Sequence, residues 1–392
     1  MQAFEFSCPT KIICGEEALL KLPGELNDRR VSLPLVVTDA NLVSLGVAER
    51  ALEPLREAGI PYRVFDQVPP DSSLDVVGEV AEMYQGQGCD GFVAIGGGSV
   101  IDTVKGAAAS ISTGGEDFAR LQGSEILHEE LPPFIAIPTT AGTGSEVTLV
   151  AVVADTQAHA KLSYTSYRLV PHCALLDPTL TTSLPPKLTA TTAVDALTHA
   201  IEAYTSIQKN PVSDALACGA IDLISRNLDE ACTNPENRDA RTNLALGSCM
   251  AGAAFSNAMV GLVHAIGHSL GGLAHVPHGL AMTILLPHCV HFNNQNGYHA
   301  GLYGQMLPYL DPTAPVFQDP IEADRAFEAA LFQMNSRLHD AYGVPILLAE
   351  ANVGHDSLPA VARQARYDGA ALYNRQEITE EAALEILEAS YR

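Results

Sequence analysis

The chain lacks tryptophan, is only 6% aromatic, and carries 22 basic residues against 46 acidic ones. With so few aromatics, a chain that is 47% hydrophobic must build its core mainly from alanine, leucine, valine and isoleucine. The formal net charge of −24 predicts repulsion from nucleic acids and from anionic membrane surfaces. The composition therefore favours partners that are small molecules.

Long apolar runs and paired cysteines are also missing. No stretch reaches the roughly 18 uninterrupted apolar residues of a membrane-spanning helix, and the N-terminal residues lack the basic and apolar regions of a signal peptide. The eight cysteines include no Cys-x-x-Cys pair and no zinc-finger spacing. In a chain of this size they predict reduced, mostly buried thiols. We therefore expect a cytoplasmic protein without a membrane partner.

The hydrophobic pattern changes near residues 178–186. Before that point, short apolar β-runs alternate with helical stretches, which predicts a mostly parallel sheet covered on both faces. After it, the sequence is rich in alanine and leucine with helical periodicity. The length favours about two or three domains. We predict an α/β dinucleotide-binding domain over residues 1–182 and an all-helical domain over residues 183–392.

The expected elements can be placed by residue number. Strands are predicted at 35–38, 62–65, 91–95, 134–137 and 173–176, and helices in the first half at 41–58, 73–87 and 99–112. Further helices are predicted at 186–206, 211–230, 238–257, 260–273 and 320–342. Residues 4–8 are predicted to form a short strand without a hairpin partner, and residues 293–319 a long connection.

The most informative motif is a set of carboxylate and imidazole side chains at metal-ligand spacing. Asp195 and His199 are four residues apart, as are His264 and His268, so each pair shares one helix face. His278 follows a glycine pair at residues 271–272, where the chain can fold back toward the same point. A solvated helix face would show the same spacing, but the flanks are apolar, and titratable groups among apolar residues need a partner. These donors suit Fe²⁺ or Zn²⁺.

Three glycines and a serine, Gly96 to Ser99, follow the predicted strand at 91–95 and open a helix. Glycines let the backbone approach a phosphate, and a helix N-terminus offers free N–H groups and positive potential. Ser99 is predicted to cap that helix. A plain turn would also explain the glycines, because the sequence departs from the Gly-x-Gly-x-x-Gly fingerprint.

Two more features lie at the carboxyl ends of predicted strands, where open α/β sheets bind their ligands. One is the loop at residues 138–146, which is rich in glycine and hydroxyl groups. The other is Asp39, whose carboxylate would hold a ribose diol and repel a 2′-phosphate. A helix N-cap explains Asp39 equally well. Together these loops predict a dinucleotide, with NAD favoured over NADP.

With these motifs in place, the chain resembles the iron-containing (group III) alcohol dehydrogenase family, which includes lactaldehyde reductases and 1,3-propanediol dehydrogenases. The resemblance rests on the segments 96–105, 138–146, 195–202 and 261–279. It implies that Asp195, His199, His264 and His278 are the metal ligands and that His268 lines the substrate cleft beside the nicotinamide. The cofactor residues that it implies are Gly97, Gly98, Ser99 and Asp102 at the pyrophosphate, and Thr139, Thr140, Ser145, Thr148, Lys161 and Leu180 in the rest of the groove. The family's Pro-Asn-Pro-Thr segment is replaced here by residues 68–72, which puts a contact at Asp71 in doubt.

The resemblance implies a dehydroquinate-synthase-like architecture and a metal-dependent alcohol dehydrogenase. Hydride would pass between NAD and a small primary alcohol, diol or aldehyde in the cleft between the two domains. His268 is the candidate proton relay, or else a further ligand. An NAD- and metal-using lyase is the first alternative, but the metal helices lack the basic residues that a phosphate-bearing acid requires. Glycerol-dehydrogenase-like polyol oxidation is a second alternative, and a non-catalytic binding protein a third. An unpaired N-terminal edge strand predicts at least a homodimer.

Overall fold

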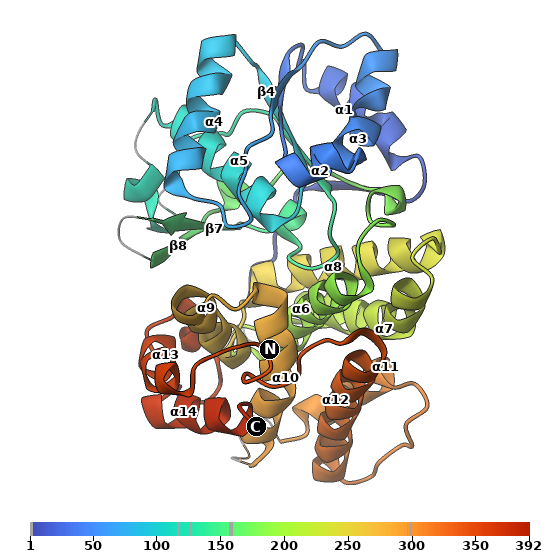
Figure 1. Ribbon diagram of the computed structural model, residues 1–392, viewed down its shortest axis with the longest axis vertical. Helices are drawn as coiled ribbons and strands as arrows, with labels where there is room; N and C mark the ends of the chain where they lie inside the picture. The colour runs from blue at the N-terminus through green and yellow to red at the C-terminus, as the bar shows by residue number, and fades with distance from the viewer. Residues whose placement is uncertain (1–2, 116–117, 126, 157–159, 296, 298–299) are drawn as a thin grey trace. The chain divides into compact units, whose positions relative to one another are not determined.

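The structure is a computed structural model of the 392-residue chain, and it describes all residues except 1–2, 116–117, 126, 157–159, 296 and 298–299. It divides into two compact units. One unit is Ser7–Ser183, and the other contains Leu184–Arg392 together with residues 3–6. Figure 1 shows strands in the first unit and helices throughout the second.

The first unit is built on a six-stranded sheet in which every pair of neighbouring strands is parallel. The strand order is β1-β9-β6-β4-β2-β3. The strands are β1 (Lys11–Cys14), β2 (Pro34–Val37), β3 (Arg63–Phe65), β4 (Gly91–Gly96), β6 (Phe134–Pro138) and β9 (Cys173–Leu176). This confirms the predicted parallel α/β sheet. β1 was missed because it is a short edge strand with mostly exposed side chains.

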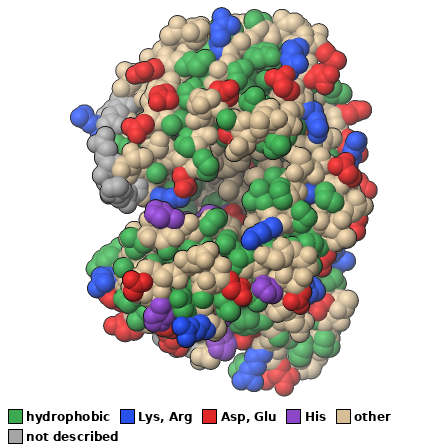
Figure 2. Space-filling model, viewed as in Figure 1, with side chains coloured by type: hydrophobic (Ala, Val, Ile, Leu, Met, Phe, Trp, Pro, Cys, Tyr) green, Lys and Arg blue, Asp and Glu red, His purple; other side chains and the backbone are tan. Residues whose placement is uncertain are grey.

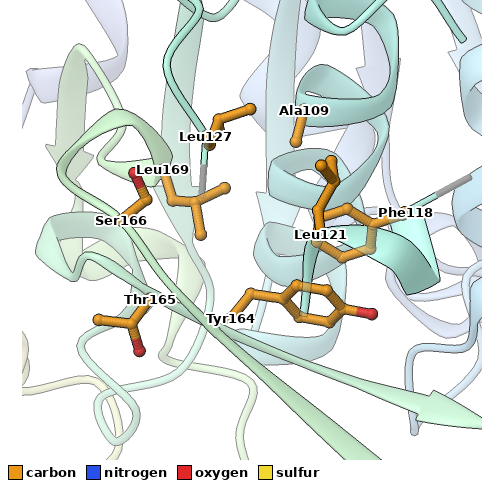
Figure 3. Close-up of a pocket in the computed structure, with 8 residues that line it drawn as sticks. All are labelled: Ala109, Phe118, Leu121, Leu127, Tyr164, Thr165, Ser166 and Leu169. Atoms are coloured by element: carbon orange, nitrogen blue, oxygen red, sulfur yellow. The ribbon is translucent and has the colours of Figure 1, made fainter. Parts of the chain in front are cut away.

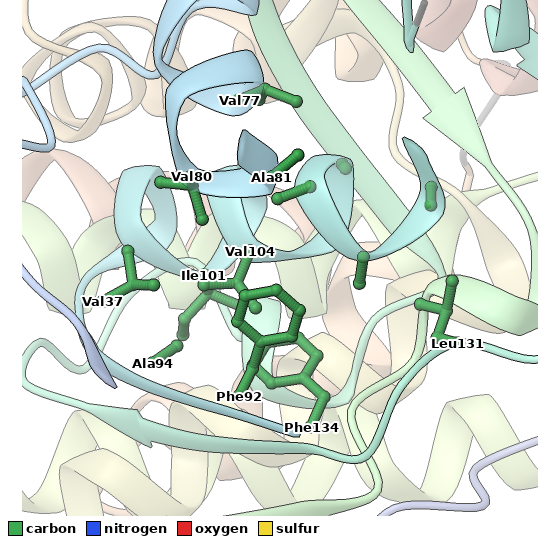
Figure 4. Close-up of a cluster of buried hydrophobic side chains, with 14 of the residues drawn as sticks. Val37, Val77, Val80, Ala81, Phe92, Ala94, Ile101, Val104, Leu131 and Phe134 are labelled. Carbon is green, nitrogen blue, oxygen red and sulfur yellow. The ribbon is translucent and has the colours of Figure 1, made fainter. Parts of the chain in front are cut away.

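Two hydrophobic cores cover the two faces of this sheet. Along β4, Phe92 and Ala94 enter one core while Val93 and Ile95 enter the other, as the two-residue period of a strand requires. Figure 4 shows the first core, where α4 and α5 pack over β4 and β6. The helices of this unit are α1 (Leu22–Asp28), α2 (Ala40–Ser44), α3 (Val47–Glu57), α4 (Leu74–Gln87) and α5 (Gly98–Ser112), with α1 and α3 in the second core.

A second, three-stranded sheet in this unit has the order β5-β8-β7, and the sequence patterns did not predict it. Its strands are β5 (Gly123–Ser124), β7 (Val150–Asp155) and β8 (Ala160–Thr165), with β7 and β8 antiparallel. Buried and half-exposed side chains alternate along most of β7. This period is weak in a short strand next to polar loops, which explains why it was overlooked.

Three further predictions for the first unit need correction. The predicted helix at 41–58 is broken into α2 and α3 by Gly46, whose φ of 71° lies in the left-handed region. The predicted strand at 4–8 is irregular, and the first strand begins at Lys11. Ser99 does not cap α5, because Gly97 is the N-cap and Ser99 lies inside the helix, where its hydroxyl donates to the Pro70 carbonyl.

Among its described residues the second unit contains helices and no strand. Helix α6 contacts α7, α8 and α10 and is buried along nearly its whole length. Helix α7 begins with a capping box in which Asn210 and Ser213 satisfy each other's backbone N–H groups. The helices are α6 (Pro186–Thr205), α7 (Pro211–Thr233), α8 (Arg238–Ala258), α9 (Leu262–Ala274), α10 (His278–Gln295), α11 (Leu302–Leu310), α12 (Pro320–Tyr342), α13 (Leu358–Ala365) and α14 (Glu380–Ala389).

The predicted long connection at 293–319 is wrong, because α10 extends to Gln295 and α11 occupies Leu302–Leu310. The fold-back before His278 also differs from expectation. The glycine pair at 271–272 lies within α9, and the chain turns at His275, whose φ is 55°. Within the described residues no single helix is long and apolar enough to cross a membrane. α8 and α9 meet the length and composition criteria only as a pair, bent by 102°.

All eight cysteines are free thiols, and five of them are buried, as predicted. Their burial raises the pKa of several, including that of Cys173 to about 12. On the face drawn in Figure 2, acidic and basic side chains are interspersed with hydrophobic ones. The negative net charge is therefore not gathered into one acidic patch on that face.

Candidate metal centre and nucleotide site

Three helices of the second unit bring together the four predicted metal ligands. Asp195 and His199 lie one turn apart on α6, His264 lies in the first turn of α9, and His278 is the first residue of α10. Each offers one ligand atom, and these four atoms lie within 4.8 Å of one another. The four-residue spacing on α6 therefore puts Asp195 and His199 on one helix face, as the sequence predicted. The turn at His275 allows α10 to contribute the His278 imidazole.

One carboxylate oxygen lies at the centre of the cluster. Asp195 Oδ1 is 3.2 Å from His278 Nε2, 3.8 Å from His264 Nε2 and 4.0 Å from His199 Nε2. Asp195, His199 and His264 are buried, whereas the His278 side chain is 37% exposed. Three of the four residues are thus buried, and His278 is the partly exposed member of the cluster.

Several polar atoms in this cluster have no hydrogen-bond partner. Among the described residues, Asp195 Oδ1, His199 Nδ1 and His264 Nε2 are buried and unpaired. Leaving such a group unsatisfied costs roughly 1–3 kcal/mol, so a cation that bound Asp195 Oδ1 and His264 Nε2 would remove that cost for both atoms. Three nitrogen donors and one carboxylate oxygen form a set that Fe²⁺ or Zn²⁺ accepts. The residues therefore fit a divalent transition metal.

The electrostatics favour the protonation states that bind metal. Burial lowers the pKa of His199 to about 3 and also lowers that of His264, so both imidazoles are neutral near pH 7. Burial alone would raise the pKa of Asp195, but the nearby His199 and His278 rings outweigh it and lower that pKa. Neutral imidazoles and an ionised carboxylate are the forms that ligate a metal.

Glu202 supports the cluster from a second position on α6. Its Oε2 lies 2.6 Å from His264 Nδ1 and accepts from the Gly261 N–H, while its Oε1 accepts from the Val263 N–H at 2.6 Å. One buried carboxylate thus satisfies the start of α9 and orients the His264 ring. Burial raises the pKa of Glu202 to about 7. Sequence reasoning gave this residue no role, although it lies seven residues, about two turns, after Asp195 on the same helix.

His268 lies one turn beyond His264 on α9. Its ring centroid is 5.7 Å from that of His264 and 5.6 Å from that of His278, and its side chain is 30% exposed. Its Nδ1 lies 3.0 Å from Asp368 Oδ2. Asp368 also went unnoticed in the sequence, because no spacing rule links residues that are a hundred positions apart.

In the first unit, the glycine loop leads from β4 into α5, as predicted. A Cβ on Gly98 would lie 2.9 Å from Thr143 Cγ2, and one on Gly97 would lie 3.2 Å from Thr140 Oγ1. The glycines are thus needed for close packing against the loop at 138–146. Thr139 belongs to the same contact, since its N–H donates to the Gly96 carbonyl at 3.1 Å.

A buried polar network lies behind these two loops. Asp102 accepts from the Ser145 hydroxyl at 2.5 Å and from the Val152 N–H at 3.0 Å. Lys105 is fully buried and donates to Thr148 Oγ1 and to the Thr148 and Val150 carbonyls. Burial lowers the pKa of Lys105 to about 8 and raises that of Asp102. Both Asp102 oxygens are therefore already engaged within the protein.

The other predicted cofactor residues fall in three places. Asp39 follows β2 and caps α2 by accepting from the Leu42 N–H at 2.9 Å. Leu180 follows β9 and is buried in the second core. Both therefore lie beyond the carboxyl ends of sheet strands, as do Gly97, Gly98 and Thr140. Lys161 lies on β8 and forms an ion pair with Asp71 at 2.9 Å.

A small pocket elsewhere in the first unit contains none of the predicted residues. It is lined mainly by apolar side chains, among them Phe118, Leu121, Leu127 and Tyr164, which surround a narrow space (Figure 3). The Phe118 and Tyr164 rings stack at 3.8 Å between centroids. With this tight stacking and no charged group in its lining, the pocket is a packing feature of the core.

Comparison with known proteins assigns both units to one family. Residues 9–178 match the model for iron-containing alcohol dehydrogenase, and residues 189–391 match the model for the C-terminal part of that family. The chain is 38% identical over 359 residues to a 1,3-propanediol dehydrogenase from Citrobacter freundii, covering 91% of each chain. It is 34% identical to an NAD-dependent methanol dehydrogenase from Bacillus methanolicus, covering 93% of each. A crystal structure of 1,3-propanediol oxidoreductase matches the whole of both chains with a TM-score of 0.94 and 34% identity.

Proposed function

The chain belongs to the iron-containing alcohol dehydrogenase family and is an oxidoreductase; from that premise we propose that it transfers hydride reversibly between NAD and a small primary alcohol, diol or aldehyde. The observation that carries this proposal is the buried Asp195, His199, His264 and His278 cluster, with its unpaired ligand atoms. We assign Fe²⁺ to that cluster, with Zn²⁺ as the alternative that the same donors accept.

The proposed nucleotide site lies at the carboxyl ends of β2, β4 and β6. Gly97, Gly98 and Ser99 form the start of α5, where free N–H groups and the helix dipole favour a pyrophosphate. Thr139, Thr140, Thr148, Lys161 and Leu180 complete the proposed groove. Asp102 and Ser145 contribute by holding the two loops together, since the Asp102 carboxylate is engaged by the protein.

The cofactor preference rests on Asp39, which follows β2. In this proposal its carboxylate accepts from a ribose diol and repels a 2′-phosphate. The helix cap occupies Oδ1. The second oxygen is therefore the proposed contact with the ribose, so the two roles of Asp39 are compatible.

In the proposed mechanism the residues of the second unit bind the alcohol and handle its proton. The ion, when bound, supplies the Lewis acidity that lowers the pKa of the substrate hydroxyl, and NAD supplies the hydride acceptor. His268 lies beside the rings of His264 and His278 and is the proposed proton relay, because an imidazole can both accept and donate a proton. Asp195, His199, His264 and His278 already supply four donors, which argues against His268 as a fifth ligand.

The lyase alternative has less support. An enzyme that holds a phosphate-bearing acid next to the metal needs basic side chains there, and the segments 195–206 and 261–279 contain no lysine or arginine. Polyol oxidation of the glycerol-dehydrogenase type can be distinguished from oxidation of primary alcohols by the substrates that the protein accepts. A panel of short alcohols, 1,3-diols and glycerol, compared by kcat/KM, distinguishes it from the proposed preference for primary alcohols.

We also propose that the protein is cytoplasmic and forms at least a homodimer. The edge-strand argument now applies to β1, which pairs with β9 on one side and is mostly exposed along the other, with Ile12 at 40% exposure. An unpaired edge invites pairing with a second copy. Light scattering at micromolar concentration should give at least twice the chain mass of 41.5 kDa, and a species of that mass alone would contradict the dimer.

The proposed activity is tested by NADH formation in anaerobically purified protein supplied with Fe²⁺, Zn²⁺ or a chelator. Turnover of a short primary alcohol should require the metal and fall when it is removed. A matched control is His355→Ala, which removes an exposed imidazole that pairs with Glu388 and is not a member of the cluster. Full turnover in chelated protein would contradict the metal-dependent function.

A further inference from the structure

Asp368 and His268 meet within the second unit although they come from distant segments. Asp368 precedes η7 (Gly369–Tyr373) and is its N-cap, with Oδ1 accepting from the Ala370 N–H at 2.8 Å. Its other oxygen, Oδ2, lies 3.0 Å from His268 Nδ1. The two oxygens of one carboxylate thus have separate partners, and the cap fixes the position from which Oδ2 meets the ring.

This contact selects one form of the His268 ring. An ionised carboxylate can only accept hydrogen bonds, so the proton between the two residues belongs to His268 Nδ1. The neutral ring then carries its lone pair on Nε2. A relay has to accept a proton through one defined nitrogen, and a ring free to exchange tautomers would do so for only part of the time.

The same arrangement occurs at the neighbouring histidine on α9. Glu202 holds His264 Nδ1 at 2.6 Å, and His264 Nε2 is the atom that faces Asp195. Carboxylates therefore hold the Nδ1 atoms of both His264 and His268. His268 differs in being 30% exposed, against 2% for His264, which suits a group that exchanges protons with substrate or solvent.

We propose that Asp368 is the positioning residue for the proton relay, holding His268 as the Nδ1–H tautomer with Nε2 as its proton acceptor. This inference rests on the proposed role of His268. Asp368 touches neither substrate nor metal in this account and acts only through the imidazole.

The test is a double-mutant cycle with Asp368→Asn and His268→Ala in the metal-loaded full chain. Asparagine keeps an oxygen to cap η7, but the amide nitrogen that replaces Oδ2 cannot accept from Nδ1–H. Asp368→Asn should lower kcat by about tenfold to a hundredfold, because a mis-set tautomer disables a relay histidine. In the His268→Ala background the same change should alter kcat by less than about twofold, since the coupled partner is gone.

Asp319→Asn is the matched control, because Asp319 caps α12 by accepting from the Ile321 N–H in the same unit and has no hydrogen bond or ion pair with a histidine among the described residues. It should leave kcat unchanged. Metal content and KM for NAD should be the same in wild type, Asp368→Asn and Asp319→Asn. A loss of metal or of cofactor binding in Asp368→Asn would assign Asp368 a structural role and overturn the proposal.

A spectroscopic readout is independent of turnover. Nitrogen-15 NMR of histidine-labelled, zinc-loaded protein can identify the His268 signals as those missing from His268→Ala. Wild type should show the Nδ1–H tautomer, and Asp368→Asn should shift the ring toward the Nε2–H form. An Nε2–H tautomer in wild type would overturn the proposal.

The kinetic outcomes separate this inference from the function on which it rests. If His268→Ala keeps wild-type kcat, the relay itself is wrong and the role of Asp368 falls with it. If His268→Ala is impaired but Asp368→Asn is not, only the role of Asp368 is wrong. An equal loss of kcat from Asp368→Asn in the wild-type and His268→Ala backgrounds would also overturn the role proposed for Asp368.

Discussion

The two units each bury a cluster of titratable side chains, and the clusters differ in whether their polar atoms have hydrogen-bond partners. In the α/β unit, Lys105 donates three hydrogen bonds, and Asp102 accepts from Ser145 and Val152. In the helical unit, Asp195 Oδ1 and His264 Nε2 have no hydrogen-bond partner in the described part of the chain. The first cluster has hydrogen-bond partners for its charged groups, whereas the second leaves buried atoms unpaired at the proposed metal site.

This difference separates scaffold from site. A satisfied buried network fixes the geometry of the loops around it and needs no ligand. An unsatisfied one carries an energetic penalty, which a bound ion or water can remove. We therefore propose that the Lys105 network supports the loops around it and that the Asp195 cluster takes part in the reaction. The following predictions compare the effects of substitutions in the two clusters.

The largest expected effect is that of His264→Ala. Removing one of four ligands opens the cluster, so turnover should be abolished and metal content should fall. The measurement is NADH formation beside metal analysis of the same preparation. Normal activity with full metal occupancy would refute the assignment of His264.

His268→Ala should lower kcat by about a hundredfold or more, as is typical of a lost general acid–base group, while metal and NADH binding persist. The loss should ease at alkaline pH, where solvent hydroxide can accept the proton. If the variant instead loses metal and added metal restores its rate, His268 is a metal ligand and not the proton relay.

Lys105→Met tests the satisfied cluster. Removing one partner of a buried polar pair typically costs about 3–5 kcal/mol, so urea should unfold the α/β unit more easily while metal content stays unchanged. The pKa of Lys105 is lowered to about 8 in the folded protein, so between about pH 8 and 10.5 the unfolded chain binds more protons. This lysine therefore makes stability rise with pH in that window, and the variant should lose the rise.

The control for that experiment is Lys21→Met, at an exposed lysine of the same unit. It should leave both the unfolding midpoint and its pH dependence unchanged. A Lys105→Met protein as stable as wild type would show that the network is dispensable for the fold.

The smallest effect is expected at Asp39. Asp39→Gly should narrow the ratio of NAD to NADP efficiencies, since the charge that repels a 2′-phosphate is lost. Asp39→Asn keeps an oxygen for the Leu42 N–H cap and removes only the charge. If the two variants narrow the ratio alike, charge sets the preference. If neither variant changes the ratio of NAD to NADP efficiencies, Asp39 acts only as a helix cap.

Helical periodicity is a local rule, so the sequence alone predicted that Asp195 and His199 share one helix face, whereas the set of four candidate ligands came from the family resemblance. Four-residue spacing places Asp195 beside His199 whatever the rest of the fold does. Contacts made through tertiary structure gave no such signal. Asp368 reaches His268 from a hundred residues away, and β1 joins the sheet only because β9 lies beside it. The prediction that Ser99 caps α5 was wrong for a local reason. The helix begins at Gly98, so Gly97 is the N-cap and Ser99 lies inside the helix.

The central claim is that the helical cluster is incomplete without a metal. Its most direct test is the unfolding midpoint of the helical unit with and without metal, in wild type and in Asp195→Asn. A ligand at about a thousand times its Kd stabilises by about 4 kcal/mol. Wild type should bind one ion per chain and unfold at distinctly higher urea when loaded, and Asp195→Asn should lose most of that difference. Equal midpoints for loaded and stripped wild type, or full metal binding by Asp195→Asn, would contradict the account.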